Sequence, residues 1–500
     1  MNPSEIKLRQ REIPDLDLDR RARLRCAAAS ELVEAGRCEE AREALGELWR
    51  GVGERPETQG LSILTTAEVL LQCGVLTGWL GSARQASDAQ ERAKDLLFES
   101  LRAFEAAGLA EKVAEAQCEL GLCYFRLGAY DEGRVILETA LDGLGPEAAG
   151  LRARIAVRRA SVEIWEGRYY EARRVLEEAR PALDAAGDAL RGKWHGQMGL
   201  VFRRLASAEA RPEYYDSAII EFTAAIYHHE LAGHERYVAG NTNNLAMVLY
   251  NLGRYAEAHE HLDRAQAILT RLNDAGQLAY VDETRASVLV AEKRYAEADR
   301  FIGGVVRYLE PGGESALLAE ALTIQGVVRA RLGDYENSVA ILRRAMKVAQ
   351  ESGAQTLAAQ AALALIEEHG ASTRLPAEEL SKIYRRADEL LKGTQDAEDI
   401  ARLRASARAV IKRLARAELH ERDFTFYSAV HELEARLIEQ ALELEDGSLT
   451  RAAKRLGLKH QSLAHMLRAR HAQLLDKRTP PIPRRRSIIR QRKNSPRKGE

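Results

Sequence analysis

The strongest concentration of side chains that could recognise a charged partner lies near the C-terminus. Between Gly447 and Leu475 there are six basic residues and no acidic residue. Basic and amide side chains on an exposed helix face can donate hydrogen bonds to phosphates and to the edges of bases. We expect the base-edge contacts to come from Lys459, His460, Gln461, Ala464, His465 and Arg468. We expect the phosphate contacts to come from Arg451, Lys454, Ser462 and Arg470.

These side chains need a compact group of helices to hold them. A first helix is predicted by an apolar stripe at helical spacing, made of Leu433, Leu437, Ile438, Ala441 and Leu442. Residues 446–448 break it and cap a short second helix over 449–456. Gly457 opens the turn to a third helix, from about 460 to 470. Ala453 is expected where the last two helices cross, with Leu458 and Leu463 in the core.

The segment 447–463, with its double alanine and its Leu-Gly and Ser-Leu pairs, resembles the factor-for-inversion-stimulation (Fis) type helix-turn-helix. That module also ends many bacterial enhancer-binding activators. The resemblance implies binding to double-stranded DNA, as a dimer on half-sites one helical turn apart. Ser448 and His460 stand where the family commonly has Asn and Arg, and the nucleotide-hydrolysing module of those activators is absent. The alternative is a helical module that uses the same motif to contact protein.

A second candidate site depends on an internal repeat. The phrase is glycine, any residue, tyrosine, two residues and a small residue, and it recurs with a period near 40 residues. Its tyrosines are Tyr130, Tyr169, Tyr255, Tyr295 and Tyr335, and Tyr215 fits once an insertion at 206–212 is allowed. We predict a helical hairpin at each copy. The glycine ends the first helix in a left-handed turn, and small residues let the two helices approach closely.

These units resemble tetratricopeptide repeats of the longer, roughly 40-residue kind, and residues 243–258 look much like the repeats of kinesin light chains. The resemblance implies a superhelix whose concave groove, lined by first helices, binds a protein segment or extended peptide. Groove positions are expected eleven and fifteen residues before each tyrosine. They are Glu119, Arg154, Arg158, Asn244, Tyr280 and Thr284 and, after allowing for the insertion at 206–212, Lys193 and Gln197. The alternative is that these are only solvated polar residues.

The composition of the chain indicates in which compartment the protein is expected. The chain has 500 residues and a net charge of −1. The last 25 residues carry ten basic and two acidic groups, which leaves the body mildly acidic. The five cysteines form no CxxC pair and indicate free thiols in a reducing compartment. We find neither a signal peptide nor a long uninterrupted apolar run, and we expect a cytoplasmic protein without membrane contact.

No pattern in the chain indicates catalysis. Phosphate-binding loops, serine-hydrolase elbows and zinc-protease helices are absent from the sequence. The histidine pairs at 228–229 and 259–261 lack further residues at metal-ligand spacing. We therefore expect no enzyme activity, no cofactor and no metal.

The predicted fold is all-α, with a tetratricopeptide-like α-solenoid in a right-handed superhelix. We predict a polar segment at 1–19, the repeat array at 20–395, a helical linker at 396–423, the helix-turn-helix domain at 424–475 and a disordered basic tail at 476–500. The preferred function is a DNA-binding transcriptional regulator whose array binds a protein or peptide, and we expect the regulator to be a homodimer. One alternative is a protein-protein scaffold that uses the C-terminal module for docking. Another is an RNA adaptor that works through the tail.

Overall fold

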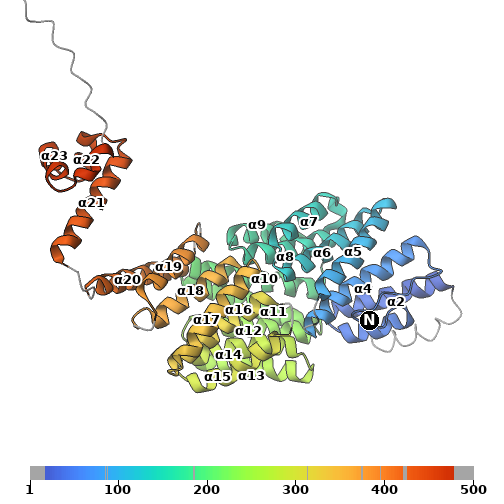
Figure 1. Ribbon diagram of the computed structural model, residues 1–500. Coiled ribbons are helices and arrows are strands. Elements are labelled where there is room, and N and C mark those ends of the chain that lie inside the picture. The colour runs from blue at the N-terminus through green and yellow to red at the C-terminus, as the bar shows by residue number, and fades with distance from the viewer. Residues whose placement is uncertain are drawn as a thin grey trace, which may run out of the picture. The chain divides into compact units, whose positions relative to one another are not determined.

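The computed structural model describes residues 17–477, apart from residues 85, 87, 184–185, 312–313, 373–374, 393, 395 and 420–424. Regular elements in these described residues are all helical (Figure 1). The chain divides into two compact units, Met1–Arg413 and Leu414–Glu500. The predicted basic tail lies outside the described residues beyond Lys477, as does most of the polar N-terminal segment.

The first unit is an α-solenoid in which consecutive helices pair as hairpins (Figure 1). The fold class predicted from the sequence is confirmed. The helices are α2 (Leu18–Glu34), α3 (Cys38–Leu45), α4 (Ile63–Ala83), α5 (Ala89–Ala106), α6 (Ala110–Leu127), α7 (Tyr130–Asp142), α8 (Ala149–Trp165), α9 (Tyr169–Ala179), α10 (Asp188–Ala208), α11 (Glu213–Leu231), α12 (Glu235–Asn251), α13 (Tyr255–Arg271), α14 (Ala275–Ala291), α15 (Tyr295–Leu309), α16 (Ser315–Arg331), α17 (Tyr335–Glu351), α18 (Gln355–His369) and α19 (Ala377–Leu390). The next helix, α20 (Ala397–Leu419), contains the boundary between the two units.

Each recurring phrase forms the corner of a hairpin, as predicted. The glycines before the corner tyrosines have positive φ angles, for example 72° at Gly253 and 85° at Gly333. Glycine adopts this conformation without the steric penalty that a Cβ atom brings. At two corners that lack glycine, Ala210 and Lys293 take the same conformation, with φ 52° and 62°. The tyrosine then begins the second helix, as at Tyr255 and Tyr335.

Small residues allow the close approach of the two helices in a hairpin. A Cβ atom added to Gly326 would lie 2.5 Å from Cγ of Leu342, and one added to Gly121 would lie 2.6 Å from Cδ2 of Leu137. Ala246 and Ala286 fill the same position in two other hairpins and are fully buried. These four residues each lie nine positions before a corner tyrosine, so the small residue recurs with the repeat.

Helix α4 is long and apolar enough to cross a membrane by length and composition alone. Polar residues such as Glu68 and Gln72 interrupt its apolar residues, so it contains no long uninterrupted apolar run. In the structure, 72% of its most apolar window is buried inside the array, as expected for the core helix of a solenoid. The five cysteines are free thiols, and four of them are buried.

The second unit contains α21 (Phe426–Leu444), α22 (Leu449–Arg455), α23 (His460–Ala469) and the short 3₁₀ helix η5 (Ala472–Lys477). Its core is made by Ile438, Ala441, Leu442, Ala452, Ala453, Leu463, Leu467 and Leu474. Asp446 and Gly447, with φ 48° and 73°, end α21, and Gly457, with φ 67°, makes the turn between α22 and α23. This is the predicted helix-turn-helix.

Candidate functional sites

One face of α23 is buried and the other is exposed. Leu463 and Leu467 pack in the core with no exposed surface. The side chains proposed to contact nucleic acid are exposed, and they are Arg451, Lys454, Lys459, His460, Gln461, Ser462, His465, Arg468 and Arg470. The helix therefore presents polar donors on the face that the core leaves uncovered.

Acidic residues of the same unit hold some of these basic side chains. Nε of Arg451 lies 3.2 Å from Oε2 of Glu445, and Nη1 of Arg470 lies 3.3 Å from a carboxylate oxygen of Glu434. Nε of Arg468 donates to the carbonyl of Ala464 on its own helix, at 3.1 Å. Within the described residues, no ion pair involves Lys454 or Lys459. These two lysines keep their full charge available to an anionic partner.

Three details of the prediction need correction. Leu458 does not plug the core, because it follows the turn glycine on the outer side and 36% of it is exposed. Ala464 is buried, since it borders the stripe formed by Leu463 and Leu467, and so it is not a base-contacting residue. Ser448 is the N-cap residue of α22 as predicted, but its side chain makes no capping hydrogen bond.

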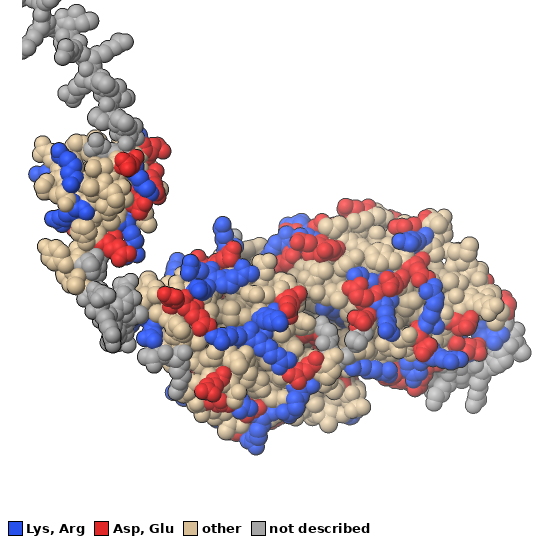
Figure 2. All heavy atoms as spheres, in the orientation of Figure 1, with Lys and Arg blue, Asp and Glu red and all other residues tan. Residues whose placement is uncertain are grey.

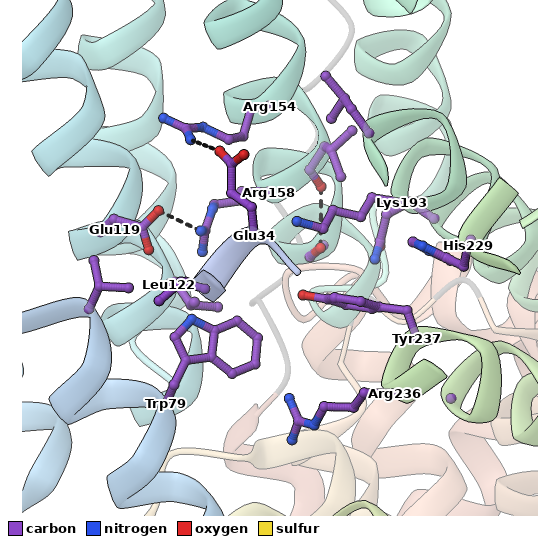
Figure 3. Close-up of a pocket in the computed structure, with 18 of the residues that line it drawn as sticks. Glu34, Trp79, Glu119, Leu122, Arg154, Arg158, Lys193, His229, Arg236 and Tyr237 are labelled. Atoms are coloured by element: carbon purple, nitrogen blue, oxygen red, sulfur yellow. Dashed lines mark hydrogen bonds and ion pairs between the residues drawn. The ribbon is translucent and has the colours of Figure 1, made fainter. Parts of the chain in front are cut away.

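The first helices of the array surround a cavity of about 320 Å³ (Figure 3). Its walls come from α2, α4, α6, α8, α10 and α12, with His229 of α11 and Gln277 of α14. The aromatic rings of Trp79 and Tyr237 face it from opposite walls, with Leu122 beside Trp79 (Figure 3). We call this cavity the chamber. Its volume lies at the lower end of the range for small-ligand sites.

Several arginines of the chamber are paired with carboxylates. Arg158 donates to Glu119, with 2.6 Å between Nη2 and Oε1, and Arg154 lies 3.3 Å from Glu34 (Figure 3). Arg236 forms an ion pair with Asp274 and also lies over the ring of Trp79, with Cζ 5.3 Å from the ring centroid. These pairs fix the guanidinium groups and neutralise most of the charge on the wall.

Lys193 differs from these arginines. Its Nζ lies 5.2 Å from the centroid of the Tyr237 ring, and no ion pair within the described residues involves it. His229 lies nearby and stays neutral, because burial, together with His234 and Lys193, lowers its pKa to about 3. Oε1 of Gln197 is buried without a hydrogen-bond partner in the structure. The chamber thus offers a free ammonium group and a free amide acceptor close to an aromatic face.

Of the groove residues predicted from the sequence, the chamber brings together Glu119, Arg154, Arg158, Lys193, Gln197 and Asn244. Tyr280 and Thr284 do not line it. Thr284 is buried, and its hydroxyl donates to the carbonyl of Tyr280 at 3.0 Å, one turn earlier on α14.

Sequence reasoning missed Trp79, Arg236 and Tyr237. Tyr237 could have been found from the repeat. It and Gln277 lie at equivalent positions in successive repeats, each 18 residues before a corner tyrosine, and both line the chamber. Trp79 also had a signal in the repeat, because it lies eleven residues before Gln90, and Gln90 stands one period of about 40 residues before Tyr130. The glycine and the tyrosine of the phrase are both missing at that corner, which made the copy easy to overlook.

The fold and these sites define a tetratricopeptide-repeat solenoid that carries a C-terminal helix-turn-helix domain of the Fis type. Two family models support this description. The one described as "bacterial regulatory protein, Fis family" matches residues 429–468, and the tetratricopeptide repeat matches residues 319–352. No curated protein matches the chain.

The array is similar to several solved structures, and one of them has a TM-score above 0.5. The crystal structure of a Rap protein complexed with competence and sporulation factor is 15% identical, with a TM-score of 0.51, over 78% of this chain and 99% of that one. Yeast Tom70 is 12% identical with a TM-score of 0.42, over 79% of this chain and 83% of that one. BtubC from P. vanneervenii is 17% identical with a TM-score of 0.35, over 46% of this chain and 91% of that one.

Proposed function

We propose that this protein is a DNA-binding transcriptional regulator. The C-terminal unit binds double-stranded DNA, and the array binds a protein or peptide that controls it. The observation that carries the proposal is the division of α23 into a buried apolar face and an exposed face of polar and basic side chains, in a unit that matches the Fis family over residues 429–468. A recognition helix needs this division, because it must pack on its domain and fill the major groove at the same time.

The roles follow from the chemistry of each side chain. Gln461 suits a bidentate contact to adenine, and Arg468 suits guanine, with Lys459, His460 and His465 beside them. Lys454 and Ser462 contact phosphates. Arg451 and Arg470 do so from fixed positions, since Glu445 and Glu434 hold their guanidinium groups.

The proposal includes a homodimer that forms through α21. One face of this helix packs in the domain core, but a second apolar stripe is exposed. The stripe is Phe426, Val430, Leu433, Leu437 and Leu444, and Leu433 and Leu437 are 50% and 47% exposed. Its spacing of mostly three and four residues is that of a helix seam between two copies. A two-fold dimer would set two recognition helices about 34–36 Å apart, one turn of the DNA.

The test is selection of binding sites from a random pool of double-stranded DNA by the full-length protein. We expect a two-fold related motif. Replacing Gln461 with Ala should relax the preference at one position in each half-site, with a loss of about 1–3 kcal/mol for the preferred base pair. Arg436→Ala is the matched control, since Arg436 is an exposed cation on α21. Absence of any enriched motif would refute the proposal and favour the scaffold.

A further inference from the structure

The superhelix of the array closes on itself through contacts between successive turns. The hydroxyl of Tyr308 on α15 donates to the carbonyl of Ala83 at the end of α4, at 2.9 Å and across 225 residues of sequence. Oγ of Ser207, at the end of α10, donates to Oε2 of Glu398 in the first turn of α20, at 3.0 Å. The start of α20 is therefore held by the array.

One face of α20 packs against α18 (Figure 1). Nε and Nη2 of Arg402 each donate to a carboxylate oxygen of Glu367 on α18, both at 2.9 Å. Asp399, Ser406 and Val410 lie on the same face of α20 and are buried. Because this face is covered by the array, a partner of α20 must bind to the opposite face.

The opposite face of α20 carries a row of cations. Arg404 and Arg408 each lie two residues from Ser406, which is a rotation of about 200° around the helix. Lys412 lies two residues from Val410 and extends the row by one more turn. All three cations are exposed, and no ion pair among the residues that the structure describes involves them. We call Arg404, Arg408 and Lys412 the basic row.

The basic row differs from exposed arginines elsewhere in the array. Nε of Arg254 donates to Glu257 on its own helix at 2.7 Å. Nε of Arg294 likewise donates to Glu297 at 2.8 Å. Residues 400–415 of α20 include five basic and no acidic residues, so the row has no carboxylate three or four positions away. Its charge therefore remains available to a polyanion.

The spacing of the basic row suits a nucleic-acid backbone. Cations four residues apart on a helix are about 6 Å apart along its axis. Each strand of B-DNA has one phosphate for about 3.4 Å of axis, so the three cations can contact three different phosphates. A membrane surface fits less well, because such a helix needs a broad apolar face. Among the described residues of α20, Ile411 is the one large apolar side chain that is exposed.

The basic row is also close in sequence to the Fis-type unit. Helix α20 continues for seven residues from Lys412 to Leu419, which adds about 10 Å. Seven further residues lead to Phe426 at the start of α21, and a stretch of that length spans at most about 25 Å. The chain thus tethers the row within about 35 Å of α21, which is about one turn of DNA.

We propose that α20 is a second DNA-binding element, whose basic row contacts phosphates of the duplex beside the half-site that α23 reads. The inference rests on the proposed function and adds a contact surface outside the Fis-type unit. The row carries no sequence information, because phosphate contacts position a protein on the duplex without specifying the bases. It increases the affinity, lengthens the DNA that is covered and makes binding depend more steeply on salt.

The test measures the affinity of the full-length protein over a range of salt concentrations. The duplex extends at least one helical turn beyond the selected motif on each side. We expect the triple variant Arg404→Ala, Arg408→Ala, Lys412→Ala to reduce the slope of log affinity against log salt by about 2.7, since each phosphate contact contributes about 0.9. The selected motif should not change. The double variant Arg404→Lys, Arg408→Lys should keep the slope, because it keeps the charge.

The matched control removes the same charge from other helices. Arg102 on α5 and Arg300 and Arg307 on α15 are exposed and form no ion pair within the described part of the chain, so their triple alanine variant should keep the slope. An unchanged slope in the basic-row variant, or an equal fall in the control, would overturn the proposal. Loss of retention on phosphatidylserine vesicles without a change in slope would overturn it in favour of a membrane. Since phosphate contacts do not depend on sequence, the slope is also measured on an arbitrary duplex, and the row is tested even if no motif is selected.

Discussion

Alanine substitutions at two glycines in neighbouring helices can measure how much the close packing within a hairpin contributes to the free energy of unfolding. Gly326 in α16 and Gly304 in α15 both lie in helix interiors, where alanine is favoured over glycine by about 1 kcal/mol. A Cβ atom at Gly304 meets nothing within 4 Å. At Gly326 it would lie 2.5 Å from Cγ of Leu342, a side chain with no exposed surface. Overpacking of this kind costs about 1–3 kcal/mol.

We therefore expect Gly304→Ala to stabilise the array by about 1 kcal/mol and Gly326→Ala to destabilise it by roughly 1 kcal/mol after the helix preference is subtracted. The assay is urea unfolding followed by far-ultraviolet circular dichroism, with midpoints compared at equal slope. The preference for alanine is common to both variants, so the difference between them reports the contact with Leu342. Equal midpoints would refute the claim that the corner hairpins depend on a small residue at this position.

Four further outcomes are expected. Burial and the carboxylate of Glu320 raise the pKa of Glu283 on α14, so the stability that Glu283 contributes is present below its ordinary pKa of 4.5 and is lost as pH rises towards its folded pKa; Glu283→Gln should flatten this fall in a pH series of thermal melts. Leu437→Glu should halve the mass measured by light scattering, because it puts a charge in the exposed stripe of α21 without touching the domain core. Lys454→Ala should weaken binding equally at all DNA sequences and reduce the slope of log affinity against log salt by about 0.9. Burial raises the pKa of the Cys123 thiol to about 12, so Ellman's reagent should react with it only after unfolding, whereas the half-buried Cys38 should react first.

The hairpins are predictable from the sequence because their determinants are local. A residue with positive φ, a tyrosine and a small residue lie within a few positions of one another, so the phrase at 253–258 specifies its own corner. The helix-turn-helix is predictable for the same reason, since Ala453 and Gly457 are four residues apart. Leu458 was misassigned because the residue after a left-handed glycine leaves the preceding helix, and helical periodicity no longer gives its direction.

The chamber was only partly predictable. A fixed offset from the corner tyrosine identifies first-helix positions such as Arg154 and Arg158, because every hairpin repeats the same geometry. The same offset fails at Thr284, where the side chain turns back to its own helix. The closure of the superhelix has no local signal, because the hydrogen bond between Tyr308 and Ala83 depends on the twist accumulated over the intervening hairpins.

That closure also changes how the array folds. In an open solenoid each repeat contacts only its neighbours, so stability is nearly a sum of adjacent interfaces and folding can spread from any repeat. Here α4 contacts α14, and Ala83 and Ser82 form hydrogen bonds with Tyr308 and Glu314. The N-terminal hairpins therefore gain their last contacts only after a further stretch of more than 200 residues has been synthesised. Thermal unfolding of the array should therefore be more cooperative than that of an open solenoid with the same number of repeats. Removal of the C-terminal hairpins should also lower the stability of the N-terminal hairpins.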